Sequence, residues 1–266
     1  MNNILVCSPK YYGADYEINP WMDVHREVDK DIAMLQWERM CEKLVRAGAT
    51  LKYIEPEHGY PDMVFTANAG LVYGKTVILS NFKHKERVHE KWFFKDWFLN
   101  NGYRVIEIPD KINFEGEGDA LFFGGVLFMG YGFRTDLRAH SIIENVLGIE
   151  VVSCELVDPR FYHLDTCFLP IDGRIIYYKD AFSKKTQKKM LEKLVDVGHN
   201  LGSLDVLSVH KDQAKDFLCN SIEINDTVIT PSDMFSLSFS GRKTLVCDMS
   251  EFMKSGGAVK CLTLKL

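Results

Sequence analysis

One cysteine, one histidine and three carboxylates in this sequence have the residue types that nucleophilic catalysis on a cationic substrate requires. Cys261 offers a thiol that can attack an electrophilic carbon, and His163 offers an imidazole that can transfer protons near neutral pH. Glu115, Asp119 and Asp165 supply negative charge for a cation. A planar guanidinium pairs with carboxylates through parallel hydrogen bonds, and its central carbon is an electrophile. Together these residues predict chemistry on a guanidinium compound, provided that the fold gathers them.

Each of these residues on its own also fits a structural role. A single cysteine is more often a small buried side chain than a nucleophile, and a buried histidine is more often a hydrogen-bonded core residue. Glu115 and Asp119 lie in a glycine-rich segment, where they also suit a turn. The catalytic interpretation therefore depends on the arrangement of the whole chain.

The elements that would position these residues recur with a period near fifty residues. Apolar residues at helical spacing predict a helix over residues 29–47 that ends at Gly48. A strand is predicted directly after it, over residues 49–55. Glycines in comparable positions are separated by 54, 46, 50 and 43 residues: Gly48, Gly102, Gly148, Gly198 and Gly241. Periods of this length are typical of propellers and other repeat arrays. The alternative is an ordinary α/β protein in which the glycines match by chance.

A polar residue opens a strand hairpin after each glycine. The distances are 20, 17, 17, 22 and 20 residues, and the residues are Asn68, Asp119, Asp165, Asn220 and Cys261. Hairpins are predicted over residues 68–80, 119–130 and 164–178, and strand alternation would put His163, Asp165 and Cys167 on one face. The last unit keeps one hairpin strand, 257–264, whose partner is 4–9, so that the two ends of the chain close a ring. Residues 1–266 are thus expected to form one α/β domain with the polar residues at its axis.

Five stretches of the sequence resemble one enzyme superfamily: YEINPWM (16–22), FTANAG (65–70), FEGEGDAL (114–121), HLD (163–165) and KSGGAVKCLT (254–263). They are similar to the guanidino-group-modifying enzymes, which include amidinotransferases, arginine deiminases and dimethylarginine hydrolases, and most closely to the arginine dihydrolase branch. The resemblance implies a five-bladed α/β propeller, the pentein fold, with a central active site. It also implies that Cys261 is the nucleophile, His163 the general acid and base, Glu115 its catalytic partner and Asp165 a guanidinium ligand.

The resemblance extends to the substrate contacts. Deiminases of the superfamily carry an aspartate where this chain has Asn68, and in the dihydrolase branch the asparagine is associated with carrying arginine past citrulline to ornithine. Asn19, Arg87 and Arg134 resemble that branch's contacts to the amino and carboxylate groups of the substrate; a solvated surface pair is the alternative for the two arginines. The Glu-Gly-Glu-Gly-Asp spacing leaves Glu115 and Glu117 both open as the catalytic carboxylate.

The electrostatics of such a site are unusual for a cysteine enzyme. Nearby carboxylates repel a thiolate and raise the thiol pKa above its reference of about 8.5, whereas a bound guanidinium reverses that sign. We therefore expect Cys261 to stay protonated until the cationic substrate arrives.

Other classes of protein fit less well. The chain has 46% hydrophobic and 26% charged residues, which is typical of globular proteins and excludes disorder, and a net charge of −5 gives no basic excess for nucleic acid. Its apolar runs are too short for a membrane span, and the absence of a signal segment together with seven cysteines without paired spacing suggests a cytoplasmic location.

No cofactor or metal is expected. A metal-dependent ureohydrolase needs dense Asp and His motifs, and a dinucleotide-binding loop needs a third glycine at the position of Leu121. The expected partner is a small guanidino compound. Deiminase, dimethylarginine hydrolase, amidinotransferase, a non-enzymatic pentein-type protein and a homo-oligomer remain open.

Overall fold

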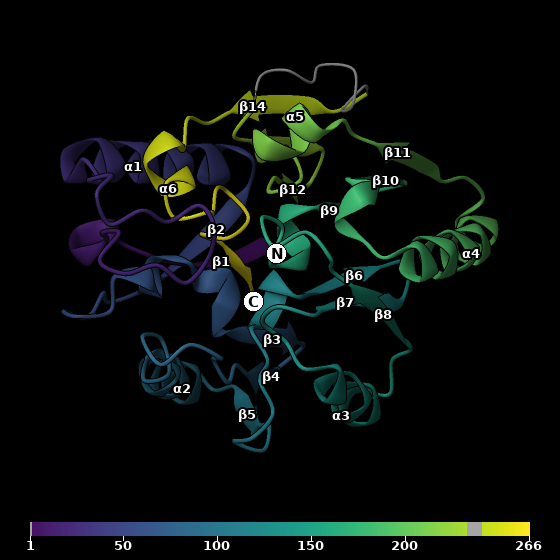
Figure 1. Cartoon of the computed structure of the whole chain (residues 1–266), viewed down its shortest axis with the longest axis horizontal. Helices are drawn as coiled ribbons and strands as arrows, with labels where there is room; N and C mark the ends of the chain where they lie inside the picture. Colours follow the sequence, from purple (N-terminus) through teal and green to yellow (C-terminus); the bar gives the residue numbers. More distant parts are fainter. Residues whose placement is uncertain (1, 233–240) are drawn as a thin grey trace.

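The computed structural model describes residues 2–232 and 241–266, and within them fifteen strands form five three-stranded sheets around a central axis (Figure 1). The sheets are β15-β1-β2 (Leu264–Lys265, Asn2–Cys7 and Ala49–Ile54), β3-β4-β5 (Gly70–Tyr73, Thr76–Leu79 and Arg104–Glu107), β6-β7-β8 (Ala120–Phe123, Val126–Tyr131 and Val151–Glu155), β9-β10-β11 (Phe168–Ile171, Arg174–Tyr177 and Asp205–Ser208) and β12-β13-β14 (Ile222–Ile224, Thr227–Thr230 and Lys243–Val246). Each sheet is an antiparallel pair extended by a parallel third strand. The predicted fold class, a five-bladed α/β propeller, is confirmed.

Long helices on the outside of the ring connect the second strand of a unit to its parallel third strand (Figure 1). Parallel neighbours need such a crossover because a short turn cannot bring the chain back to the same end. The helices are α1 (Lys30–Arg46), α2 (Glu90–Asn100), α3 (Leu137–Leu147) and α4 (Lys184–Leu201), with two short ones, α5 (Lys211–Lys215) and α6 (Ser250–Met253). The predicted first helix is confirmed: Asp29 accepts hydrogen bonds from the backbone N–H groups of Asp31 and Ile32 and so caps its first turn.

The glycine pattern predicts three helix ends correctly and one wrongly. Gly48 and Gly102 follow helices with positive φ, and Gly148 caps α3 in the left-handed conformation. Gly198 lies inside α4, whose left-handed cap is Gly202. A Cβ added at Gly198 would lie 3.1 Å from the Leu204 side chain, so the helix uses this glycine for close packing and continues past it. The helix expected before Gly241 lies outside the described residues.

The two ends of the chain pair as predicted. Strands β15 and β1 are antiparallel, with Leu5 opposite Leu264. The expected strand over residues 257–264 is wrong in extent, since β15 comprises only Leu264–Lys265. The backbone before it is used differently: Lys260 N donates to the carbonyl of Asn220, and Leu262 N donates to that of Ala258. These turn bonds prevent a sheet ladder in that segment.

The residues expected to begin the hairpins lie in short turns that precede the strands. Three of these turns are 3-10 helices, η3 (Thr66–Ala69), η4 (Gly116–Gly118) and η5 (Leu164–Thr166), and the other 3-10 helices are η1 (Pro9–Tyr11), η2 (Pro61–Val64) and η6 (Lys179–Ala181). The predicted strand alternation of His163, Asp165 and Cys167 is therefore wrong, because these residues span a 3-10 turn and not an extended strand.

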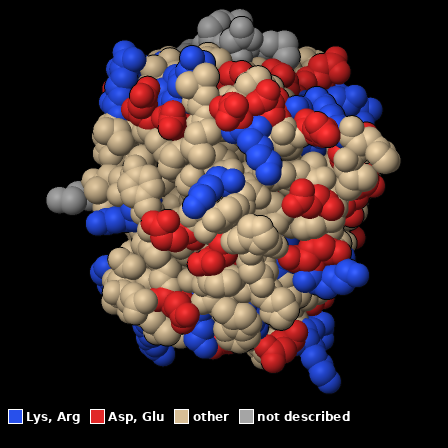
Figure 2. Space-filling view, turned by 90° about the vertical axis from the view of Figure 1, so that its left-hand side faces the viewer, with Lys and Arg blue, Asp and Glu red and all other residues tan. Residues whose placement is uncertain are grey.

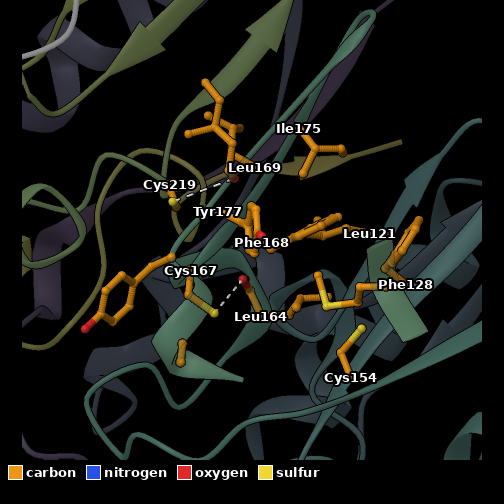
Figure 3. Packing of buried hydrophobic residues seen from close by; sticks show 14 of the residues in the cluster. Leu121, Phe128, Cys154, Leu164, Cys167, Phe168, Leu169, Ile175, Tyr177 and Cys219 are labelled. Atoms are coloured by element: carbon orange, nitrogen blue, oxygen red, sulfur yellow. Dashed lines mark hydrogen bonds between the residues drawn. The ribbon is translucent and has the colours of Figure 1, made fainter. Parts of the chain in front are cut away.

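Apolar side chains fill the spaces between neighbouring units. In one cluster, Phe128 and Phe168 lie 5.1 Å apart between ring centroids, beside Cys154 and Cys167 (Figure 3). All seven cysteines are free and buried, which agrees with the expectation that most of them are packing residues. No helix among the described residues has the length and apolar character needed to cross a bilayer.

Gly116 lies where an added side chain would clash with the backbone of the neighbouring unit of the propeller. Its φ is +61°, and an added Cβ would lie 2.6 Å from the Ala67 carbonyl oxygen and 2.8 Å from the Gly70 backbone nitrogen. We expect Gly116→Ala to lower the free energy of unfolding by more than about 2 kcal/mol, since left-handed strain of roughly 1–2 kcal/mol adds to an overpacking cost. Urea unfolding measures this.

Gly74→Ala is the matched control, because Gly74 has a φ of +60° but nothing within 4 Å of the added Cβ. It should show the backbone strain alone. Equal losses for the two variants would contradict the close-contact explanation.

Candidate active site

One end of the ring axis gathers the polar residues that begin the five units. Asn68, Asp119 and Asp165 lie in or directly after the 3-10 turns, Asn220 precedes β12, and Cys261 lies in the turn before β15. Their exposed fractions are 2%, 1%, 0%, 0% and 2% in that order. The structure thus places residues from all five units in one buried group, as the repeat predicts.

Hydrogen bonds pass from each unit to the next around this group. The five bonds are Ala67 N to the Cys261 carbonyl (3.1 Å), Asn68 Nδ2 to the Glu115 carbonyl (3.3 Å), Leu164 N to Asp119 Oδ1 (3.0 Å), Asn220 Nδ2 to the Asp165 carbonyl (3.1 Å) and Cys261 N to Asn220 Oδ1 (3.1 Å). We call this set the axial ring. It fixes the relative positions of side chains that lie far apart in the sequence.

The Cys261 thiol lies against a carboxylate and an amide. Its Sγ–H donates to Asp165 Oδ2 at 3.2 Å, and Asn220 Nδ2 donates to Sγ at 3.0 Å. Burial raises the pKa of the thiol well above its ordinary value, and the Asp165 charge raises it further. The resting thiol is therefore protonated near neutral pH, as expected from the sequence.

His163 is held by Glu115. His163 Nε2 lies 2.8 Å from Glu115 Oε2, and Arg134 Nη1 donates to the same oxygen at 2.9 Å. Burial alone would raise the pKa of Glu115, but the Arg134 charge and the His163 hydrogen bond outweigh it and hold that pKa well below its usual range. Glu115 is thus an ionised, fully buried orienting group. No hydrogen bond joins His163 to Cys261 in the part of the chain that the structure describes.

Asp119 and Asp165 each keep one carboxylate oxygen without a partner. Oδ2 of Asp119 and Oδ1 of Asp165 are buried and accept no hydrogen bond within the described residues. Burial raises the pKa of both groups to about 6. Buried acceptors of this kind are costly unless something donates to them, and the five N–H donors of a guanidinium are suited to do so.

A narrow pocket of about 250 Å³ leads to the thiol. Its lining includes both predicted arginines and both predicted asparagines, and the full set is Ile18, Asn19, Met22, Asp62, Phe65, Asn68, Arg87, Arg134, Tyr162, Ser255 and Cys261. Arg87 and Arg134 are each only 3% exposed, so the alternative of a solvated surface pair is wrong.

The pocket arginines are fixed before any ligand arrives. Arg87 donates to Asn68 Oδ1 at 2.9 Å and to both carboxylate oxygens of Glu90. The Arg134 guanidinium lies 4.6 Å from the ring centroid of Tyr162 and also donates to the Ile18 carbonyl. Such pre-organised cations suit an anionic group of a ligand in the pocket.

Asn19 completes the predicted set of substrate contacts. Its Nδ2 donates to the Ser255 carbonyl at 3.1 Å, and its Oδ1 accepts from Trp21 N at 2.9 Å. The side chain is therefore held at the pocket wall by contacts from two segments of the chain.

Sequence reasoning does not select three residues that the structure places in the pocket or next to the thiol. Asp62 is 1% exposed, lines the pocket and has an unpartnered Oδ1 within the described residues, and Tyr162 lies against Arg134. The repeat marks Asn220 only as the start of a unit and does not predict its contact with Sγ. The regular spacing of the unit starts is the available signal for Asn220, whereas Asp62 carries no such signal.

Two open points of the sequence interpretation have a geometric answer. Glu115 is the carboxylate beside His163, whereas Glu117 pairs with Lys260 at 2.9 Å. Cys167 packs in the apolar cluster, with its sulfur 3.5 Å from the Leu164 carbonyl oxygen (Figure 3).

Residues 2–232 and 241–266 contain no group of three or more His, Cys, Asp or Glu side chains arranged to hold a metal ion.

The buried Glu115–Arg134 pair generates a stability prediction. We expect Arg134→Met to lower the free energy of unfolding at pH 7 by about 3–5 kcal/mol, because it leaves Glu115 buried without its cation. The loss of unfolding free energy should become smaller as the pH falls. Glu115 without Arg134 is protonated at a higher pH than Glu115 paired with Arg134, and a neutral carboxyl costs less to bury. Denaturant unfolding at several pH values measures both effects.

Arg138→Met serves as the control, because Arg138 pairs with Asp136 at 3.3 Å with 63% of its side chain exposed. Screening by solvent makes such a pair worth little. A comparable loss in both variants would contradict the buried-pair argument.

Comparison with known proteins identifies the family. The family model described as "N,N dimethylarginine dimethylhydrolase, eukaryotic" matches residues 13–266. The bifunctional arginine dihydrolase/ornithine cyclodeaminase ArgZ of Synechocystis is 42% identical over 99% of this chain, but the chain spans only 37% of ArgZ. The N(G),N(G)-dimethylarginine dimethylaminohydrolase of Mycobacterium tuberculosis is 39% identical over 97% of this chain and 83% of its own length.

Solved structures of members of this family have the same fold as this chain. The crystal structure of the N-terminal domain of ArgZ bound to substrate has a TM-score of 0.90 and 40% identity, and the match covers 100% of this chain and 98% of that one. A dimethylarginine dimethylaminohydrolase adduct shares the fold at a TM-score of 0.78 and 17% identity, with coverage of 100% of this chain and 99% of that chain. On these similarities, the chain belongs to the N,N-dimethylarginine dimethylhydrolase family of pentein enzymes.

Proposed function

We propose that residues 1–266 form a single catalytic domain that hydrolyses the guanidinium group of L-arginine to ornithine. The overall reaction consumes arginine and two waters and yields ornithine, two ammonia and carbon dioxide. The single observation that carries the proposal is that the buried Cys261 thiol contacts Asp165, whose Oδ1 lacks a partner among the described residues, and lines the same pocket as Arg87 and Arg134. The ArgZ relative, named as an arginine dihydrolase, supports the choice of substrate.

The roles follow from the contacts. When the cation binds, the Cys261 thiol gives its proton to His163, and the resulting thiolate attacks the guanidinium carbon. His163 gives a proton to the departing ammonia and later takes one from the water that hydrolyses the thiouronium adduct. Glu115 orients the imidazole, and Asp119 and Asp165 accept hydrogen bonds from the guanidinium.

The pocket also holds groups that suit the amino-acid part of the substrate. Arg87 and Arg134 attract the substrate carboxylate, and Asn19 contributes hydrogen bonds. The unpartnered oxygen of Asp62 suits the ammonium group. A zwitterionic end group therefore finds both charges it needs in the same pocket.

Asn68 distinguishes ornithine from citrulline as the end product. Its amide is neutral, so it can bind the uncharged ureido group of citrulline as well as a guanidinium, which permits a second round of attack by Cys261. Its Oδ1 is oriented by Arg87. A carboxylate at this position would favour the cation only.

Other products and substrates are outcomes of the same test. The M. tuberculosis relative and the family description favour methylated arginine as the second candidate, with citrulline as the product. A deiminase would also stop at citrulline, and an amidinotransferase would need an acceptor amine.

The proposed partner is a small guanidino molecule, and a homo-oligomer is compatible with it. Figure 2 shows Lys and Arg interspersed with Asp and Glu on one side of the molecule, which offers no continuous basic surface there for nucleic acid. We also propose a cytoplasmic location, which seven unpaired thiols support.

The direct test is the product of arginine. Purified protein incubated with L-arginine should give ornithine and two equivalents of ammonia, identified by mass spectrometry and an ammonia assay. Cys261→Ser should abolish turnover. Cys167→Ser is the matched control, because Cys167 is a packing residue, and it should retain turnover. Citrulline as the sole product would contradict the dihydrolase assignment, and no reaction with any guanidino compound would contradict the enzyme assignment.

Arginine binding should weaken in acid. The pKa values of Asp119 and Asp165 lie at about 6, so both carboxylates lose their charge as the pH falls below that value. Calorimetric titration of Cys261→Ala with arginine should show affinity at least about tenfold lower at pH 5 than at pH 7.5. A flat profile would show that these carboxylates do not bind the cation.

Ionisation of the thiol should depend on the cation. Near neutral pH, a cationic haloacetamidine should alkylate Cys261 faster than neutral iodoacetamide, because the bound cation offsets the Asp165 charge that raises the thiol pKa. A small free thiol corrects for the intrinsic reactivity of the two reagents. Equal corrected rates would refute substrate-assisted ionisation.

A further inference from the structure

Asn220 contacts the proposed nucleophile and has no role in the scheme above. It lies shortly before β12 (Ile222–Ile224) and is fully buried. Its side chain makes four hydrogen bonds. Nδ2 donates to Cys261 Sγ at 3.0 Å and to the Asp165 carbonyl at 3.1 Å, and Oδ1 accepts from Ala258 N at 2.9 Å and Cys261 N at 3.1 Å.

The orientation of this amide is fixed by its partners. Two backbone N–H groups, those of Ala258 and Cys261, point at one side of the amide, and only an oxygen can accept from them. The NH₂ group must therefore face the sulfur of Cys261 and the carbonyl oxygen of Asp165. A reversed amide would put two donors against two donors.

The charge around the sulfur shows why this donor matters. Asp165 Oδ2 lies 3.2 Å from Sγ and accepts the thiol proton, so it favours the neutral thiol. When the proton leaves, that contact becomes repulsive, whereas the Nδ2–H contact becomes a hydrogen bond to an anion and strengthens. Among the described residues, Asn220 is the side chain that donates to Sγ.

We propose that Asn220 is a positioning residue that holds the Cys261 loop through Oδ1 and stabilises the thiolate through Nδ2. The inference rests on the proposed function, in which Cys261 is the nucleophile. Hydrogen bonds to charged groups are worth enough to change an equilibrium by about tenfold to a hundredfold. Loss of the donor should therefore raise the pKa of the thiol by about one to two units.

The variant that separates the two roles is Asn220→Asp. It keeps an oxygen for the N–H groups of Ala258 and Cys261 and replaces the donor with a second oxygen beside the sulfur. The rate of iodoacetamide alkylation at Cys261, followed by peptide mass spectrometry from about pH 6 to 11, reports the thiol pKa. We expect the midpoint to move upward by about one unit or more and the rate at pH 8 to fall at least about tenfold.

Asn81→Asp is the matched control. Asn81 is also a buried asparagine, and its Nδ2 donates to two backbone carbonyls, those of Asp110 and Ile112, neither of which belongs to the site. This variant should lose stability without any change in the alkylation profile. An unchanged midpoint in folded Asn220→Asp would overturn the proposal, and the NH₂ signals described next separate loss of the donor from the negative charge that this variant adds.

A second measurement uses the unmodified chain, in case Asn220→Asp does not fold. With ¹⁵N-asparagine labelling, the side-chain NH₂ signals of Asn220 should shift with pH at the midpoint found by alkylation, and the shift should be absent in Cys261→Ser. Signals that do not follow the thiol would overturn the proposal. Neither measurement needs turnover, so failure to convert arginine would refute the proposed function and leave this inference to its own test.

Discussion

The axial ring of hydrogen bonds is the constraint on which the site depends. Each of its five bonds joins one unit to the next, so a shift of any unit displaces the hydrogen-bonding groups of its neighbours. Four of the bonds use a side chain of the group that begins the units, which means that the polar residues close the fold and form the site at once. Buried polar networks are favourable only when their members are satisfied. The exceptions among the described residues of the ring are the free oxygens of Asp119 and Asp165, which are the acceptors that a ligand would satisfy under the proposed function.

The buried carboxylates fall into two electrostatic classes. Glu115 has Arg134 beside it and keeps its charge, so it can orient an imidazole wherever the protein is folded. Asp119 and Asp165 have no such ion pair within the described residues, and burial moves their pKa to about 6. The structure leaves the second pair short of positive charge, which a guanidinium would supply under the proposed function. Burial and the Asp165 charge together hold the pKa of the Cys261 thiol well above its ordinary value.

The repeat can be predicted from the sequence because it depends on interactions between residues that are close in the chain. A helix face, a glycine and a polar residue before a hairpin each leave a pattern in neighbouring residues, and the five sheets follow that pattern. Gly198 departs from it because close packing against Leu204 lets a helix continue through a glycine. The segment before β15 departs from it because its backbone bonds to Asn220, a contact distant in the chain and invisible to periodicity. Asp62 could not be predicted from the sequence either. Only the folded pocket shows that its Oδ1 lacks a partner among the described residues.

Fivefold pseudo-symmetry also constrains which residue types can surround the thiol. The five starting positions follow one another around the axis in chain order (Figure 1), so the units adjacent to that of Cys261 begin with Asn68 and Asn220, and the carboxylates Asp119 and Asp165 take the two remaining positions. Neutral amides in the adjacent units leave Asp165 as the carboxylate in contact with the sulfur, which limits the repulsion that a thiolate meets. A carboxylate at either amide position would strengthen cation binding and raise the thiol pKa together. Under the proposed function, the arrangement of two amides and two acids in the units around one thiol would therefore balance binding of the cationic substrate against ionisation of the nucleophile.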